Sequence, residues 1–256
     1  MYTLITGASS GIGQAFAVEY AKKNKNLVLL ARSKEKLKAI KAELEKKYQV
    51  KVEIVMYDLS VPNVAQHAYQ RIQELGIMIE TLINCAGFAT SGKVSDVSYE
   101  QQHNEIMVNT VALFDLTKLF LDSMLKKNKG LIINVASTSA YHPIPTMAVY
   151  AASKAFVLSF TEALAMECQE SQVRIFAISP GATDTNFFSS GGGVSYGNLR
   201  TPQHVVKVTL DAIEKGKISK IDGLNNYVTS TILPRILPRK NMVTMVNTIM
   251  KKQVKK

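Results

Sequence analysis

Short apolar runs alternate with stretches of helical periodicity along most of this 256-residue chain. Tyr2–Thr6 and Leu27–Leu30 have the continuous apolar character of buried parallel strands, and apolar residues between them recur at helical spacing. Repeated strand–helix units predict an α/β fold, because each right-handed crossover needs a helix that covers the sheet. We predict a doubly wound parallel sheet of about seven strands with helices on both faces. The other five strands are expected at Val50–Tyr57, Thr81–Asn84, Leu131–Val135, Val173–Ile178 and, with the weakest pattern, near Tyr227–Val228.

Capping residues and prolines mark the expected helix boundaries. Ser33 and Ser98 stand at N-cap positions, and Gln101 completes a capping box with Ser98. Pro62 fits the first turn of a helix that ends near Leu75. Two further helices are predicted, over Ala148–Cys168 and from Thr201-Pro202 to about Lys215.

No Pro/Gly/Ser-rich linker and no internal repeat divides the chain, so residues 1–256 are predicted to form a single domain. Residues 181–200 follow the end of a strand and contain Phe187, Phe188 and three glycines. A long loop in this position is typical of a substrate lid. Residues 234–256 are interpreted as a basic C-terminal extension with helical spacing of Met, Val and Ile.

The net charge of +11 is concentrated in two regions. Residues 22–51 carry eleven Lys/Arg and three Glu, and residues 223–256 carry seven Lys/Arg and no acidic residue. Such surfaces suit a polyanionic ligand, with a solvated lysine face as an equal alternative. No nucleic-acid partner is expected, because the basic residues lack interleaved aromatics. For the C-terminal extension we favour packing or subunit contact over peripheral contact with a membrane.

Other features bound the compartment and the chemistry. The chain lacks an apolar run of about 20 residues and a segment resembling a signal peptide, so we predict a cytoplasmic location. Cys85 and Cys168 are expected to be reduced core residues. Neither has the Cys or His neighbours of a metal site, so no metal is expected.

A glycine-rich turn joins the first expected strand to the first expected helix. Its glycines permit a tight turn and let the backbone approach a pyrophosphate, and the helix N-terminus adds free N–H groups and partial positive charge. A tight turn without a ligand is the alternative. The predicted phosphate-binding residues are Gly7, Ser9, Ser10, Gly11, Ile12 and Gly13.

The end of the second strand indicates which dinucleotide binds. A carboxylate there would hold a ribose 2′-hydroxyl, but this chain has Arg32 followed by Ser33. The planar guanidinium can donate two hydrogen bonds to a phosphate. We therefore predict NADP(H) as the cofactor, with a plain surface arginine as the alternative.

Tyr150 and Lys154 stand four residues apart near the start of a predicted helix, so they share one face. A neighbouring ammonium favours the phenolate, which predicts that Lys154 lowers the pKa of Tyr150 from about 10. A phenol tuned in this way donates a proton to a carbonyl during reduction and accepts one during oxidation.

In these motifs the chain resembles the short-chain dehydrogenase/reductase family, in its compact single-domain NADP-dependent branch, over about residues 2–215. The family implies a Rossmann-type sheet and a hydride-transfer reaction. Cys85 departs from the family pattern, where a second Asn would follow Asn84. Besides the glycine turn and the Tyr/Lys pair, the resemblance rests on Asp58-Leu59, Asn84-Cys85-Ala86-Gly87, Asn109, Ser137, and Pro180-Gly181 with Thr185.

The resemblance implies a role for each matched residue. Ser137 would hydrogen-bond the substrate oxygen, Tyr150 would be the general acid/base, and Lys154 would hold the nicotinamide ribose. Tyr150 is also implied as a cofactor-binding residue. Asn109 would position a water in a proton relay, or else bond a neighbouring backbone. Ser139 competes with Ser137 for its role. The remaining cofactor-binding residues implied are Asp58 (an adenine contact, or a strand-end cap), Leu59, Asn84, Ala86, Gly87, Pro180, Gly181, Thr183 and Thr185.

Together these motifs predict one dinucleotide-binding and catalytic domain that moves a hydride between NADP(H) and a carbonyl or alcohol. The block from Ala31 to Leu37 also resembles reductases of hydrophobic ketones, such as acyl chains and steroids. The alternative is a non-catalytic dinucleotide-binding sensor or interaction protein on the same fold; an epimerase is a third reading. The family implies a homodimer or homotetramer.

Overall fold

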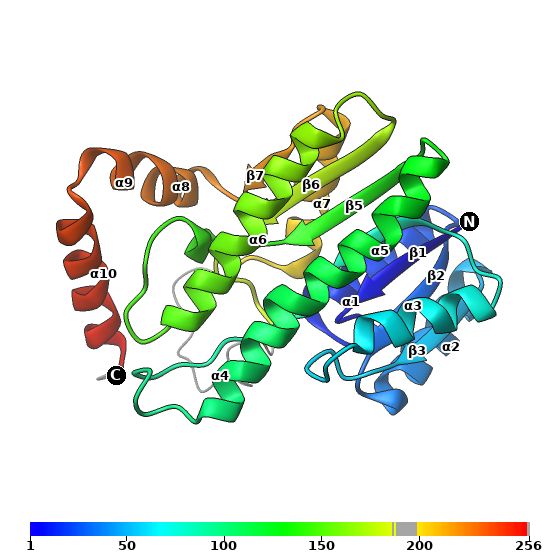
Figure 1. Cartoon of the computed structure of the whole chain (residues 1–256), viewed down its shortest axis with the longest axis horizontal. Helices are drawn as coiled ribbons and strands as arrows, with labels where there is room; N and C mark the ends of the chain where they lie inside the picture. Colours follow the sequence, from blue (N-terminus) through cyan, green and yellow to red (C-terminus); the bar gives the residue numbers. More distant parts are fainter. Residues whose placement is uncertain (186, 188–198, 255–256) are drawn as a thin grey trace.

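The computed structural model describes residues 1–185, 187 and 199–254. Within them the strands form one parallel sheet in the order β3-β2-β1-β4-β5-β6-β7 (Figure 1). The chain order reverses beside β1, which leaves a crevice at the carboxyl edge between β1 and β4. The strands are β1 (Tyr2–Thr6), β2 (Asn26–Ala31), β3 (Val52–Met56), β4 (Ile79–Asn84), β5 (Gly130–Val135), β6 (Val173–Ser179) and β7 (Ser219–Ile221).

The predicted doubly wound sheet is therefore confirmed, but the position of its last strand was wrong. Ala177–Ser179 of β6 pair with β7 at Ser219–Ile221, not with Tyr227–Val228. Tyr227 ends a short helix and Val228 begins a π-helical turn, and both side chains are exposed. An apolar pair on the open face of a helix looks like a short strand when only the sequence is read.

Most helices lie where their periodicity predicts them. They are α1 (Gly11–Lys22), α2 (Lys34–Tyr48), α3 (Val64–Glu74), α4 (Tyr99–Ile106), α5 (Ala112–Lys126), α6 (Ala148–Glu167), α7 (Pro202–Glu214), α8 (Leu224–Tyr227), α9 (Leu233–Ile236) and α10 (Arg239–Val254). Met107–Val111 form a π-helical turn that joins α4 to α5, and Val228–Ile232 form another that joins α8 to α9. Among the described residues, no helix combines the length and apolar character that crossing a bilayer requires.

The helix caps follow the sequence with one exception. The Ser98 hydroxyl accepts the backbone N–H of Gln101 at 3.3 Å, as the capping box predicts. Ser33 occupies the N-cap of α2 but makes no side-chain cap bond. Pro62 does not lie in the first turn of α3, because Asn63 adopts a left-handed conformation (φ 61°) and the helix begins only at Val64.

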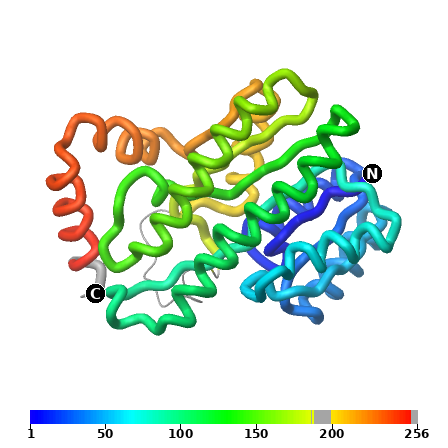
Figure 2. Tube along the Cα trace, in the orientation of Figure 1, coloured from blue at the N-terminus to red at the C-terminus, as the bar shows by residue number. Residues whose placement is uncertain are grey.

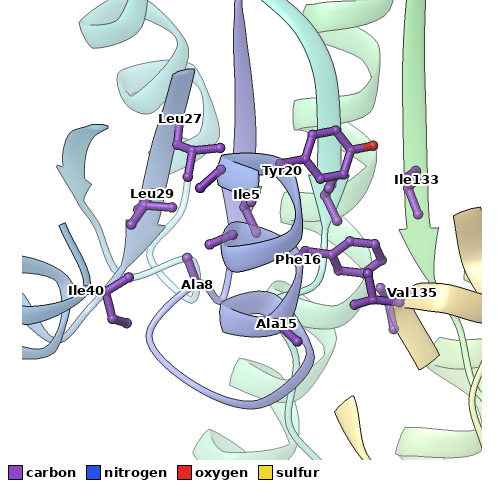
Figure 3. Packing of buried hydrophobic residues seen from close by; sticks show 14 of the residues in the cluster. Ile5, Ala8, Ala15, Phe16, Tyr20, Leu27, Leu29, Ile40, Ile133 and Val135 are labelled. Carbon is purple, nitrogen blue, oxygen red and sulfur yellow. The ribbon is translucent and has the colours of Figure 1, made fainter. Parts of the chain in front are cut away.

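Alternate residues of each strand point to opposite faces, and helices cover both. Ile5 belongs to a buried cluster that includes residues of α1, α2 and α7, whereas Leu4 belongs to one that includes residues of α3, α5 and α6. Figure 3 shows α1 against the first face, with Phe16 and Tyr20 directed toward Ile133 and Val135. Burying both faces fixes the sheet, so the polar residues that follow each strand are held at its carboxyl edge.

The C-terminal helices extend beyond this sandwich. From β7 the chain continues through α8 and α9 and returns as α10 along one end of the molecule (Figures 1 and 2). Met242, Val246 and Met250 of α10 are buried against Ala89 and Tyr150. The extension therefore closes one side of the region beyond the carboxyl edge.

Candidate active site

A cavity of about 1460 Å³ lies at the carboxyl ends of the central strands. Its volume exceeds the roughly 300–1,000 Å³ of an ordinary small-molecule pocket. All the predicted site residues line it except Asn84 and Asn109. The predicted lid, residues 181–200, lies largely outside the described residues, but its described ends meet, since Asp184 N–H donates to Arg200 O at 2.8 Å.

The glycine turn forms one wall of the cavity. Gly7 has a φ of +65°, and a Cβ there would lie 2.9 Å from the backbone of Ala86. A Cβ on Gly13 would overlap the carbonyl oxygen of Gly7. The Thr6 hydroxyl accepts the N–H groups of Cys85 and Ala86, each at 3.0 Å, which ties the ends of β1 and β4 together. The glycines therefore let the turn pack closely against the end of β4 and against the start of α1, and the N-terminal N–H groups of α1 lie beside the cavity.

Arg32 and Asp58 stand side by side at the ends of β2 and β3. Their side chains approach to 3.7 Å, and that of Arg32 is 74% exposed. Burial raises the pKa of Asp58, but hydrogen bonds from Ser60 and the charge of Arg32 outweigh it and leave the pKa lower than usual. Ser33 and Lys36 line the same end of the cavity. This cationic end, with most of the guanidinium exposed, fits a phosphate group.

Tyr150 and Ser137 meet at the opposite end. Both are buried, and Ser137 hydrogen-bonds the Tyr150 side chain. The Ser137 hydroxyl also accepts the Ser139 N–H at 3.1 Å, as the cap of a short 3₁₀ turn. Of the two competing serines, Ser137 is thus the one bonded to the tyrosine. Together Ser137 and Tyr150 present two hydroxyls to one point in the cavity, as polarisation of a carbonyl oxygen requires.

Lys154 lies one helical turn from Tyr150 on α6, as the spacing predicts. Its ammonium lies 5.9 Å from the centre of the Tyr150 ring and donates to the Val135 carbonyl at 2.8 Å. Burial lowers the pKa of Lys154 to about 8, and the charge of Glu105 opposes this shift. Lys154 therefore remains mostly protonated at neutral pH.

The prediction that Lys154 lowers the pKa of Tyr150 is wrong for the protein alone. Burial raises the pKa of Tyr150 to about 12, the hydrogen bond with Ser137 opposes this, and the charge of Glu105 adds to it. Removing the phenol from water disfavours the phenolate more than its neighbours favour it. At neutral pH the phenol is protonated, which is the form that donates a proton.

The structure does not bring Asn84 and Asn109 to the cavity surface. The Asn84 amide donates to Thr117 and Asn134 inside the fold, at 3.0 and 2.9 Å. Asn109 lies on the π-helical turn, donates to Phe88 O at 2.9 Å and Ser153 Oγ at 3.1 Å, and accepts the Phe88 N–H. The contact with a neighbouring backbone, the alternative considered for Asn109, is therefore present.

Three parts of the site were missed from the sequence. Glu105 is fully buried one turn before Asn109, accepts both the N–H and the hydroxyl of Thr90, and has a pKa raised mainly by burial. Asn226 fills the space beside Gly181. No local pattern marks Glu105 or Asn226, because their partners are distant in the chain. The third part consists of the cavity-lining residues of α10, which are Val246, Ile249 and Met250. The only sequence signal for them was the apolar spacing of that helix.

The family profile described as short chain dehydrogenase matches residues 2–191. The chain belongs to the short-chain dehydrogenase family. Members of this family are oxidoreductases that act on the CH–OH group with NAD(P), and this dehydrogenase takes small-molecule alcohols or ketones. Among the residues that the structure describes, no group of His, Cys, Asp or Glu could hold a metal ion.

Several similar proteins have names that state a substrate class or a bound cofactor. This dehydrogenase is 31% identical over 228 residues to the 7beta-hydroxysteroid dehydrogenase of Mediterraneibacter gnavus, covering 87% of this chain and 86% of the relative. A short-chain dehydrogenase from Sphingobium yanoikuyae, solved in complex with NADPH, has a TM-score of 0.84 at 30% identity, covering 95% of each chain. The bulky-bulky ketone specific alcohol dehydrogenase of Comamonas testosteroni has a TM-score of 0.81 at 26% identity, covering 95% of this chain and 93% of its own.

Proposed function

We propose that this dehydrogenase uses NADP(H) and reduces a hydrophobic ketone or aldehyde. The observation that carries the proposal is a single cavity with the Ser137, Tyr150 and Lys154 side chains at one end and Arg32 beside the glycine turn at the other. A screen of NADPH oxidation against aldehydes, cyclic ketones and 3-oxoacyl compounds tests it. If the enzyme turned over none of these three classes, that result would contradict the proposal.

The bound dinucleotide would supply the hydride for reduction or accept it in oxidation. The glycine turn and the N-terminus of α1 would hold its pyrophosphate, because the absence of a Cβ on Gly7 and Gly13 lets the turn pack tightly and brings the first N–H groups of α1 to the cavity. The Lys154 ammonium would hold the nicotinamide ribose. Arg32 and Lys36 would bind the 2′-phosphate. The NADPH in the Sphingobium yanoikuyae relative supports this preference.

Arg32→Ala is expected to weaken NADPH binding by about 10- to 100-fold and to leave NADH binding nearly unchanged, since hydrogen bonds to charged groups contribute about 1.5–3 kcal/mol. Isothermal titration with each cofactor measures the two affinities. Lys38→Ala on the exposed face of α2 is the matched control. Equal affinity of the unaltered protein for NADH and NADPH, with no loss in Arg32→Ala, would show that Arg32 is only a surface residue.

For the chemical step, Ser137 would hydrogen-bond the substrate oxygen while Tyr150 donates its proton to that oxygen. Lys154 would stabilise the developing phenolate, because its charge lies on the same helical face. Asn109 would hold Phe88 and Ser153 in place behind Lys154, and would position the water of a proton relay. The alternative of a non-catalytic sensor has no observation in its favour.

The wall around Tyr150 supports an apolar substrate. The Phe187 ring lies 5.6 Å from the Tyr150 ring, and Ile144, Met147, Val246 and Met250 also line the cavity. These side chains would bury an apolar body while the reacting oxygen meets Ser137 and Tyr150. The names of the steroid and bulky-ketone relatives agree with this class.

The assembly and location follow as further parts of the proposal. Residues 1–256 would act as one domain, because the cavity is lined from β1 through α10. The two free cysteines support a cytoplasmic location. A homodimer or homotetramer is supported by the aromatic cluster of Phe114 on α5 with Phe156 and Phe160 on α6, whose rings lie 5.6–5.7 Å apart.

Phe114→Ser with Phe156→Ser is expected to convert the oligomer into a monomer, because both rings are exposed in the single chain. Light scattering after size-exclusion chromatography measures the mass. Met78→Ser, which is also exposed but lies elsewhere, is the control. An unchanged oligomer in the double variant would place the subunit contact on another face.

A further inference from the structure

An exposed apolar stripe runs along the helical segment from α8 to α9. Leu224, Val228, Ile232 and Ile236 recur every four residues and are 75%, 41%, 41% and 71% exposed. Residues four apart lie on one side of a helix, so these side chains form a continuous ridge. Apolar groups that lie together and open to water mark an interaction surface.

The charged residues within the segment that carries this stripe are all basic. Arg235, Arg239 and Lys240 are exposed beside its C-terminal end. The sequence from residue 223 to residue 256 contains no Asp or Glu. An apolar helix face flanked by basic side chains is the pattern of a helix that lies in the headgroup region of an anionic bilayer.

The other basic region of the chain, residues 22–51, lacks such an apolar stripe. Residues 22–51 are more strongly basic, yet no large apolar side chain in that range is exposed. That region offers charge alone, which salt screens readily. Only the α8–α9 region and its flank combine basic charge with an exposed apolar ridge of this length among the described residues.

A second copy of this chain is less suited than an anionic lipid surface to cover the stripe. In a symmetric contact, the ridge of one copy would offer no acidic residue to pair with Arg235, Arg239 and Lys240 of the other, because residues 223–256 contain none. The aromatic cluster on α5 and α6 offers an uncharged alternative for subunit contact, on a different part of the molecule (Figure 1). The apolar side of α10 is no competitor either, because Met242, Val246 and Met250 are already buried.

We propose that the ridge of Leu224, Val228, Ile232 and Ile236, with Arg235, Arg239 and Lys240, docks the protein on an anionic lipid surface. The side chains enter the headgroup region while the basic groups pair with lipid phosphates and carboxylates. Asn225, Asn226 and Thr229 of the same segment line the cavity, so docking brings the cavity toward the bilayer. Delivery of an apolar substrate from the bilayer would follow from this, and that step alone rests on the proposed function.

Co-sedimentation of the full chain with vesicles tests the docking without any use of turnover. We expect binding to vesicles of phosphatidylcholine with about 30% phosphatidylserine and little binding to phosphatidylcholine alone. In 0.5 M salt the partition coefficient on the anionic vesicles should fall about tenfold. Leu224→Ser with Ile236→Ser is expected to lower the partition coefficient at least tenfold, because it removes the two most exposed apolar groups. Val61→Ser, 51% exposed on another part of the chain, should bind like the unaltered protein.

A charge pair of variants locates the basic contribution. Arg239→Glu with Lys240→Glu should abolish binding, whereas Lys46→Glu with Lys47→Glu, exposed at the C-terminal end of α2 away from Arg32, should weaken it less than threefold. Circular dichroism and NADPH affinity, which none of these changes should alter, show that each variant is folded. Absent binding to the anionic vesicles, equal binding by the Leu224/Ile236 variant, or a larger loss from the α2 variant would overturn the proposal. A fall in solution mass of the Leu224/Ile236 variant without any vesicle binding would instead identify the ridge as a contact between copies.

Discussion

Tyr150→Phe is expected to lower kcat/KM for NADPH-dependent ketone reduction by about 10²- to 10⁴-fold, the usual contribution of a general acid. Phenylalanine keeps the ring in its buried position against Phe187 and Met147 but has no proton to donate. NADPH affinity should change little, because the ring and its packing remain. Stopped-flow measurement of NADPH oxidation, with titration of NADPH binding, separates the two effects.

Tyr141→Phe is the matched control, because the Tyr141 hydroxyl lies 3.5 Å from Ser179 and does not line the cavity. That variant should keep turnover within about threefold of the unaltered protein. Unchanged turnover in Tyr150→Phe would remove Tyr150 from the mechanism. The raised pKa of Tyr150, about 12, adds a directional test: alcohol oxidation needs the phenolate, so its rate should climb through alkaline pH while reduction does not.

Lys154→Met is expected to reduce turnover by a similar factor and, at the same time, to change how stability depends on pH. Burial lowers the pKa of Lys154 from 10.5 to about 8, so the folded state loses its proton more readily than the unfolded chain. Below pH 8 both states carry the proton, and folding bears a desolvation cost of about 3 kcal/mol, at about 1.4 kcal/mol per pKa unit. Between pH 8 and 10.5 the unfolded chain binds more protons, so the stability of the unaltered protein rises.

The variant lacks this titration. The difference in unfolding free energy between Lys154→Met and the unaltered protein should therefore shift by about 3 kcal/mol in favour of the unaltered protein between pH 7.5 and 10.5. Urea unfolding at several pH values measures this difference, and other titrating groups cancel in it. Lys118→Met, at an exposed position, should show no such shift. A constant difference across this range would mean that Lys154 is not desolvated in the folded protein.

The sequence by itself determined the order of the first six strands, with the helices between them, and the identity of most site residues. Continuous apolar runs such as Leu27–Leu30 are short and typical of strands buried on both faces, and α/β crossovers then place their carboxyl ends together. The glycine turn, Arg32 and the Tyr150/Lys154 pair each involve only a few neighbouring residues, so their chemistry can be inferred from the sequence without the tertiary structure. For the same reason the resemblance to the family was apparent from short motifs in the right order.

Only the tertiary structure decided the pKa values of the site residues and which C-terminal residues line the cavity. Whether Tyr150 is made more or less acidic depends on how much water its surroundings exclude, which no spacing reveals. The sequence assigned Asn84 to the cofactor and did not mark Glu105, because the partners that bury them, Thr117 and Thr90, lie far from them along the chain. The apolar pair Tyr227–Val228 fits a strand or a helix equally well by period. It became part of an exposed helical face because β6 pairs with Ser219–Ile221 and leaves it no strand to join.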